Sequence, residues 1–118
     1  MKKIIHVDNS EFFRKLVRTF LEKEGFEVES FDNAQEASFS IAAGSGDMVI
    51  MGLAFADIEG TEFVRKALDS FAGPVVVVSS SVDKPTEESL VDLGIRAAIN
   101  KSGNWQEGLK PHLAALKQ

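Results

Sequence analysis

The chain has 118 residues, contains no cysteine and carries a net charge of −5, from 18 acidic and 13 basic residues. This length fits one domain, residues 1–118, which can bury a core without disulfides or metal staples. The acidic balance argues against nucleic acid as the main partner, because phosphate contacts need clustered Lys and Arg. No apolar run is long enough to cross a bilayer, and the absence of cysteine fits a reducing compartment, so we expect a cytoplasmic protein without membrane contact.

The first two elements are a strand and an amphipathic helix. Residues 2–8, "KKIIHVD", are a short apolar run that predicts a buried strand. Residues 10–25 predict a helix with Ser10 as N-cap and Gly25 as its stop. Two stripes at four-residue spacing are expected to form one apolar face of this helix: Phe12, Leu16 and Phe20, and Phe13, Val17 and Leu21.

The middle of the chain repeats this alternation. "FEVESF", residues 26–31, alternates as a strand at a sheet edge would. Residues 33–46 predict a helix capped by Asp32 or Asn33 and ended by glycines. Residues 47–53, "DMVIMGL", predict a buried strand. The next helix, 61–71, has an expected inner face of Phe63, Val64, Ala67, Leu68 and Phe71.

The last third continues the pattern. Four consecutive valines in "GPVVVVSSS", residues 73–81, predict a central strand buried on both faces. Residues 83–94 predict a helix with Pro85 in its first turn, and 95–100 a weaker fifth strand. Residues 105–117 have leucines at helical spacing, but Gly108 and Pro111 interrupt them, so we expect a late start or a kink.

Strand and helix alternate five times, which predicts an α/β fold with a doubly wound, five-stranded parallel sheet. In such folds, sites lie at the carboxyl ends of the strands. The residues that follow the predicted strands are therefore the candidates for a site: Asp8, Asn9, Gly52, Ser79, Ser80 and Lys101.

Four stretches together carry a family resemblance: "IIHVDNSEFFRKLV", "DMVIMGLAFADIEGTEFVRK", "PVVVVSSS" and "LGIRAAINKSG". Over its full length the chain resembles a response-regulator receiver domain of two-component phosphorelay signalling. The resemblance implies a flavodoxin-like sheet of order 2-1-3-4-5 with about five helices. It also implies a pocket in which an aspartate accepts a phosphoryl group held by Mg²⁺.

The pocket residues depart from the family pattern. Asp8 matches the first metal-binding acid, but Asn9 replaces the second, and Gly52 stands where the phosphoacceptor aspartate is expected. Ser79 and Lys101 keep the switch hydroxyl and the amine. Two further positions also differ: Ala98 stands where an aromatic switch residue is common, and Ser102 stands where proline is usual, which makes a cis peptide after Lys101 less favoured.

These losses predict a degenerate receiver, or pseudo-receiver, with no enzyme activity and no catalytic residue. We expect no cofactor, and Mg²⁺ bound weakly or not at all at the residual acid Asp8. Lys101, having lost one carboxylate partner, is expected to pair with Asp8. That pair is either a functional remnant or an ion pair that holds two loops together, and Ser79 is either a switch remnant or a hydroxyl that satisfies loop backbone groups.

The leading hypothesis is a phosphorylation-independent interaction module that binds signalling proteins as a monomer or weak homodimer. By resemblance, the partner face is expected on helix 84–93 and the segment 95–118, with these residues: Lys84, Glu88, Arg96 and Trp105. One alternative is phosphoryl transfer to another acid, Asp8 or Asp57. The other is a sensor that binds a small ligand or anion in the space at Gly52. His6 is expected to be a packed core residue and His112 a helix-surface residue.

Overall fold

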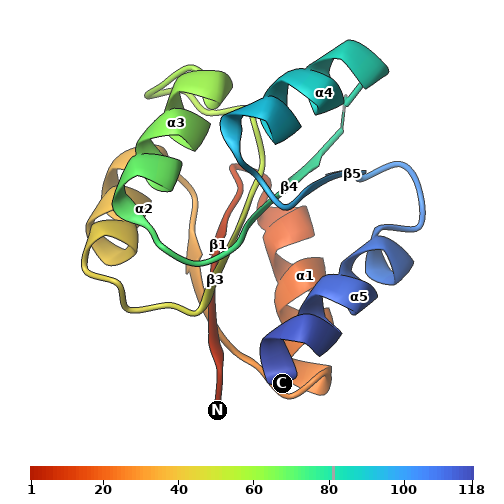
Figure 1. Cartoon of the computed structure of the whole chain (residues 1–118). Helices are drawn as coiled ribbons and strands as arrows, with labels where there is room; N and C mark the ends of the chain where they lie inside the picture. Colours follow the sequence, from red (N-terminus) through yellow and green to blue (C-terminus); the bar gives the residue numbers. More distant parts are fainter. Residues whose placement is uncertain (81) are drawn as a thin grey trace.

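The computed structural model describes residues 1–80 and 82–118, so Ser81, at the end of the predicted fourth strand, lies outside the described residues. Five strands alternate with five helices (Figure 1). In chain order they are β1 Lys3–Val7, α1 Glu11–Lys23, β2 Glu27–Phe31, α2 Ala34–Ala42, β3 Met48–Met51, α3 Gly60–Ser70, β4 Val75–Ser79, α4 Lys84–Leu93, β5 Ala97–Asn100 and α5 Trp105–Lys117. Within this part of the chain, no helix is both long and apolar enough to span a bilayer.

The strands form one parallel sheet in the order β2-β1-β3-β4-β5, which confirms the predicted topology. Strands β3 and β4 are buried along their whole length, because helices cover both faces of the sheet there. β2 lies at one edge, where Glu27 is exposed and Val28 is buried, as its alternating sequence predicts. The chain therefore brings the ends of β1, β3, β4 and β5 to one edge of the sheet.

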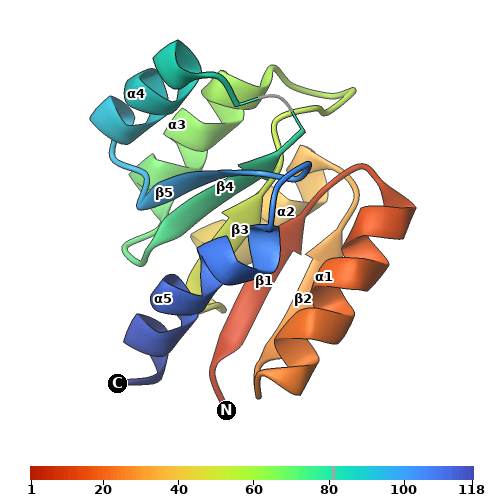
Figure 2. The same ribbon diagram turned by 90° about the vertical axis from the view of Figure 1, so that its right-hand side faces the viewer.

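The helices divide between the two faces of the sheet (Figure 2). α1 and α5 cover one face, over a core that includes Ile4, Val76 and Leu109. α2, α3 and α4 cover the other face, over a core that includes Ile5 and Phe63. Each strand contributes alternate side chains to the two cores, which is why continuous apolar runs are needed in the central strands.

Helix ends follow the expected chemistry. The Ser10 hydroxyl accepts a hydrogen bond from the backbone N–H of Phe13, and Asn33, not Asp32, caps α2. Gly25 and Gly94 follow α1 and α4 with φ of 95° and 121°, a region that disfavours a side chain.

One predicted face is wrong in part. On α1, Phe13, Val17 and Leu21 are buried, but Phe12 is 74% exposed and Leu16 is 41% exposed. The two stripes lie about 100° apart on the helix, and in the outer stripe only Phe20 packs against the core.

The expected late start of the last helix is also wrong, because α5 is helical from Trp105 and contains Pro111 inside its length. Gly108 is placed where α5 crosses β5. A Cβ at this position would lie 3.2 Å from Cγ2 of Ile99. The glycine thus permits a close approach of helix to strand instead of ending the helix.

Candidate functional site: the pocket at the carboxyl edge of the sheet

Backbone hydrogen bonds hold the strand ends of the pocket together. The N–H of Gly52 donates to the carbonyl of Val7 at 2.9 Å, which joins the end of β3 to the end of β1. The N–H of Lys101 donates to the carbonyl of Ser79 at 2.9 Å, which joins the residue after β5 to the end of β4. Gly52, Ser79 and Lys101 are thus hydrogen-bonded to the neighbouring strand at the same edge of the sheet, and so is Asp8, whose N–H donates to the carbonyl of Phe31.

Asp8 and Lys101 form a direct ion pair at this edge, as the sequence predicts. The Nζ atom of Lys101 lies 2.8 Å from Oδ2 of Asp8, and the two side chains are 21% and 2% exposed. The contact is short but does not meet the angles of a hydrogen bond, so it is mainly ionic. The other oxygen, Oδ1, accepts the backbone N–H of Ser10 at 2.8 Å. Both oxygens of the carboxylate are therefore engaged by the protein.

The ammonium group of Lys101 lies over the aromatic ring of Phe13. Nζ of Lys101 lies 4.4 Å from the centroid of the Phe13 ring, within the range of a cation–π contact. The same ring meets the indole of Trp105 edge-on, with centroids 5.2 Å apart, and Trp105 also meets Phe20 at 5.4 Å. The structure thus links the pocket lysine to the core between α1 and α5.

This packing corrects one site prediction. The predicted partner face includes Trp105, but this residue is only 6% exposed, because Phe13 and Phe20 enclose the indole in ordinary core packing. The other three residues predicted for that face, Lys84, Glu88 and Arg96, are exposed.

Two further basic residues lie near Asp8: Arg14 on α1 and His6 on β1. Nη1 of Arg14 donates to the backbone carbonyl of Asp8 at 2.7 Å. His6, on β1, is fully buried, which confirms its expected place in the core, and its ring lies 6.5 Å from Phe13. Burial lowers the pKa of His6 to about 4, opposed by the negative charge of Asp8 and assisted by the positive charges of Lys101 and Arg14. The imidazole is therefore neutral at pH 7.

Gly52 leaves no side chain at the centre of the pocket. A Cβ built on this residue would lie 3.1 Å from Oδ2 of Asp8, closer than is usual for such contacts. Gly52 does not have a positive φ, so its backbone conformation is open to any residue. What the glycine provides is space for Asp8 in the position where the carboxylate meets Lys101.

The donor set at this edge does not fit Mg²⁺. That ion prefers an octahedron of oxygen ligands anchored by carboxylates. Here both oxygens of Asp8 are engaged, Asn9 is exposed, and Gly52 contributes no oxygen from a side chain. In residues 1–80 and 82–118, no group of three or more acidic, histidine or cysteine side chains is close enough together to hold a metal.

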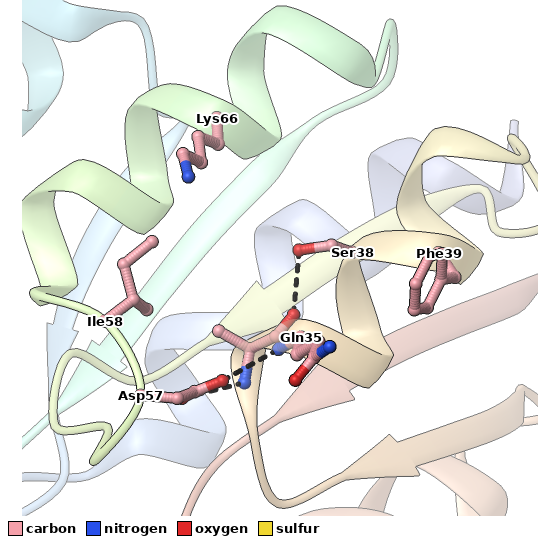
Figure 3. A pocket seen from close by; sticks show the side chains of 7 residues that line it. Gln35, Ser38, Phe39, Asp57, Ile58 and Lys66 are labelled. Carbon is pink, nitrogen blue, oxygen red and sulfur yellow. Dashed lines mark hydrogen bonds between the residues drawn. The ribbon is translucent and has the colours of Figure 1, made fainter.

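Asp57, the other alternative acceptor, caps a helix. Its carboxylate accepts the backbone N–H groups of Ala34 and Gln35 at 3.3 and 2.9 Å, at the start of α2 (Figure 3). These bonds, that of Gln35 first, lower the pKa of Asp57. The residue lines an open groove of about 330 Å³ between α2 and α3, together with Ile58 and Lys66. The sequence did not indicate this capping role, because it joins residues 22 positions apart.

Val82, just before α4, is held by a residue that the sequence did not indicate. The side-chain amide of Asn100, at the end of β5, accepts from the N–H of Val82 at 3.0 Å and donates to its carbonyl at 3.2 Å. Ser79 is buried at the end of β4, while Ser80 is exposed. Ala98 lies half-buried on β5 and leaves the switch position without an aromatic ring. The peptide bond between Lys101 and Ser102 is trans.

The comparisons with known proteins agree with this architecture. The family model "Response regulator receiver domain" matches residues 4–111, so the chain belongs to the response regulator receiver domain family, a component of two-component signalling. The KDP operon transcriptional regulatory protein KdpE of Escherichia coli K12 is 27% identical over 101 residues. That match covers 86% of this chain and 45% of KdpE.

A second relative is named as an enzyme and not as a transcriptional regulator. The protein-glutamate methylesterase/protein-glutamine glutaminase of Bacillus subtilis 168 is 30% identical over 99 residues, which cover 82% of this chain and 28% of that protein. The chain thus spans less than half the length of these two curated relatives.

Solved structures show the same fold. The BeF₃-activated N-terminal receiver domain of Klebsiella pneumoniae RstA gives a TM-score of 0.89 at 20% identity, covering 99% of this chain and all of that one. Chemotaxis protein CheY4 of Vibrio cholerae gives a TM-score of 0.83 at 23% identity, covering 98% of each chain. At these identities the likeness establishes the fold alone.

Proposed function

We propose that this receiver domain acts as a phosphorylation-independent interaction module in two-component signalling. The observation that carries the proposal is the direct 2.8 Å contact between Lys101 and Asp8 across the space at Gly52. In a working receiver, the lysine and the acids gather a phosphoryl group and a metal. Here the lysine ammonium is already the counter-ion of the remaining acid, and position 52 offers no nucleophile.

The same contacts weigh against the two alternatives. Phosphoryl transfer to Asp8 would require a buried carboxylate to leave both Lys101 and the Ser10 N–H. Transfer to Asp57 would require it to leave the start of α2. Anion binding at Lys101 would have to compete with Asp8, at a distance of 2.8 Å. Signalling is therefore set by the binding and abundance of the domain, and Mg²⁺ is not its cofactor.

By resemblance, the partner protein contacts the exposed face of α4, β5 and α5, where Lys84, Glu88 and Arg96 lie exposed. Trp105 does not contact the partner in this proposal. It packs under this face against Phe13 and Phe20, which holds the start of α5 against α1. The domain itself is a monomer or weak homodimer and works in the cytoplasm without nucleic acid or membrane contact.

Intact mass spectrometry after incubation with acetyl phosphate and excess Mg²⁺ tests the proposal. We expect no added phosphoryl mass on the protein. Gly52→Asp and the double variant Asn9→Asp/Gly52→Asp are the matched comparisons. A gain in the double variant alone would show that both the acceptor and the metal site have been lost.

A phosphoryl adduct on the unaltered protein would overturn the proposal, and peptide mapping would then identify the acceptor. An adduct that persists after Asp57→Asn but is lost after Asp8→Asn would favour the first alternative acceptor; the reverse pattern would favour the second.

A further inference from the structure

Three basic side chains line one groove at the end of the molecule opposite the degenerate pocket. The groove has a volume of about 300 Å³ and lies at the amino-terminal edge of the sheet. Lys2 precedes β1, Arg96 precedes β5, and His112 lies on α5. Figures 1 and 2 mark both chain ends at this end of the molecule, where Lys2 and Gln118 meet the groove.

The basic groups of the groove have no acidic partner in the described part of the chain. No Asp or Glu side chain lines the groove, and among the described residues neither Lys2 nor Arg96 forms an ion pair. By contrast, Lys3, Lys15, Arg18, Lys101 and Lys110 all have acidic partners. Lys2 and Arg96 are cations without a counter-ion in the groove, and on a protein of net charge −5 such a pair attracts a negative ligand, to which the imidazole of His112 adds a hydrogen-bond donor.

The fold sets the backbone positions of two of the three residues. The N–H of Arg96 donates to the carbonyl of Val75 at 2.7 Å, which places Arg96 beside the start of β4. His112 is half-buried on α5, between residues that pack on the sheet. Burial lowers the pKa of His112, and the positive charge of Arg96 on the same groove lowers it further.

We propose that Lys2, Arg96 and His112 form a binding site for a small dianion of the phosphate-monoester class. Three donors from three separate segments suit the three free oxygens of an esterified phosphate, and the guanidinium fork of Arg96 can donate to two of them. The remaining walls are mostly apolar, with Pro74, Ala115 and Leu116. They give room for the organic group on the fourth oxygen, because the groove is larger than a bare oxyanion needs.

Amide NMR titrations with sulfate and with phenyl phosphate at constant ionic strength test this site. Sulfate stays a dianion through the neutral range, so its binding reports on the protein's own titration. We expect saturable shifts at the amides of residues 2, 96 and 112 with both ions, and tighter binding of phenyl phosphate. Saturating sulfate should raise the pKa of His112, because the bound anion offsets the charges of Lys2 and Arg96.

Variants separate a site from general attraction to a basic surface. Arg96→Gln should weaken binding of both ions by at least about tenfold, as expected when a charged hydrogen-bond donor is lost. Lys2→Gln, at an exposed position before the first strand, should also weaken it. Arg65→Gln, which removes an exposed arginine of α3, is the matched control and should leave binding unchanged.

The proposal is overturned if the shifts do not saturate, or if Arg96→Gln and Arg65→Gln weaken binding equally. Equal affinity for sulfate and phenyl phosphate would overturn the assignment to an ester. None of these outcomes depends on the pocket at Gly52, so this test and that of the proposed function can fail separately.

Discussion

Asp8 is a buried carboxylate whose counter-ion is Lys101, 2.8 Å away. The carboxylate is 2% exposed, so its charge needs a partner inside the protein, and Lys101 is close enough to supply it. The sequence predicts this pair, because both residues follow parallel strands and Gly52 removes the competing acid. It does not predict that Phe13 lies under the ammonium, because nothing in a helical stripe says which residue meets a loop 88 positions away.

Replacing Lys101 by Met should destabilise the fold. The substitution leaves a buried carboxylate without a counter-ion, which costs about 3 kcal/mol in the free energy of unfolding. Urea unfolding measures this cost.

Two further variants test whether the loss comes from the buried charge. The double variant Asp8→Asn/Lys101→Met should recover most of the lost stability, because the amide keeps the bond to Ser10 without a charge. Lys15→Met, in the exposed pair with Glu11, is the control and should change stability by less than about 0.5 kcal/mol. Equal effects of Lys101→Met and Lys15→Met would refute the role of the buried pair.

His6 should make stability fall in mild acid. Its pKa is about 4 in the folded protein, below its ordinary 6.5, so the unfolded chain takes up the proton first. The contribution of His6 is fully present above pH 6.5 and is lost as the pH falls toward 4. Between pH 7 and pH 5 the loss is about 2 kcal/mol.

His6→Leu isolates this effect from the titration of carboxylates. Urea unfolding of both proteins at pH 7 and pH 5 gives the difference in pH dependence, which should be about 2 kcal/mol smaller in the variant. The same pH dependence in both proteins would mean that His6 titrates normally in the folded state, against its burial.

Among the elements, α1 shows which features a hydrophobic pattern predicts and which it does not. Its two apolar stripes predict the helix, Ser10 predicts its N-cap, and the stripe of Phe13, Val17 and Leu21 predicts the core. The pattern does not show that Phe12 and Leu16 of the other stripe are exposed while Phe20 packs on the core, because the width of the buried face depends on how the sheet and α5 meet the helix. Similarly, Gly108 reads as a helix breaker in sequence, yet its place against Ile99 suits the helix.

Two adjacent phenylalanines on α1 should respond very differently to truncation. Phe13→Ala removes a buried ring that contacts Trp105 and Lys101, and should cost about 3 to 4 kcal/mol in the free energy of unfolding. Phe12→Ala removes a ring that is 74% exposed, and should change stability by less than about 0.5 kcal/mol. Thermal or urea unfolding of the two variants compares them. Similar losses in both would mean that α1 is rotated from the position described above.

For the whole molecule, the alternation of strands and helices is enough to predict the layers and the parallel sheet, because short right-handed connections leave few other arrangements. The strand order, expected by resemblance, agrees with the structure. The pocket is predictable because strand ends meet at one edge, a property of the topology and not of side-chain packing. The capping of α2 by Asp57, the bond of Asn100 to Val82 and the groove at Arg96 depend on loop geometry, for which the sequence has no periodic signal.

Titration with Mg²⁺ decides whether Lys101 has replaced the metal as the counter-ion of Asp8. The amides of residues 8, 52 and 101 report on the pocket, and the single tryptophan, Trp105, reports on the core beside it. At physiological, millimolar Mg²⁺ we expect no saturable change in either signal, because both oxygens of Asp8 are engaged by the protein. Saturable shifts centred on residues 8 and 101 at or below that concentration would contradict the account and show that the metal site is still functional.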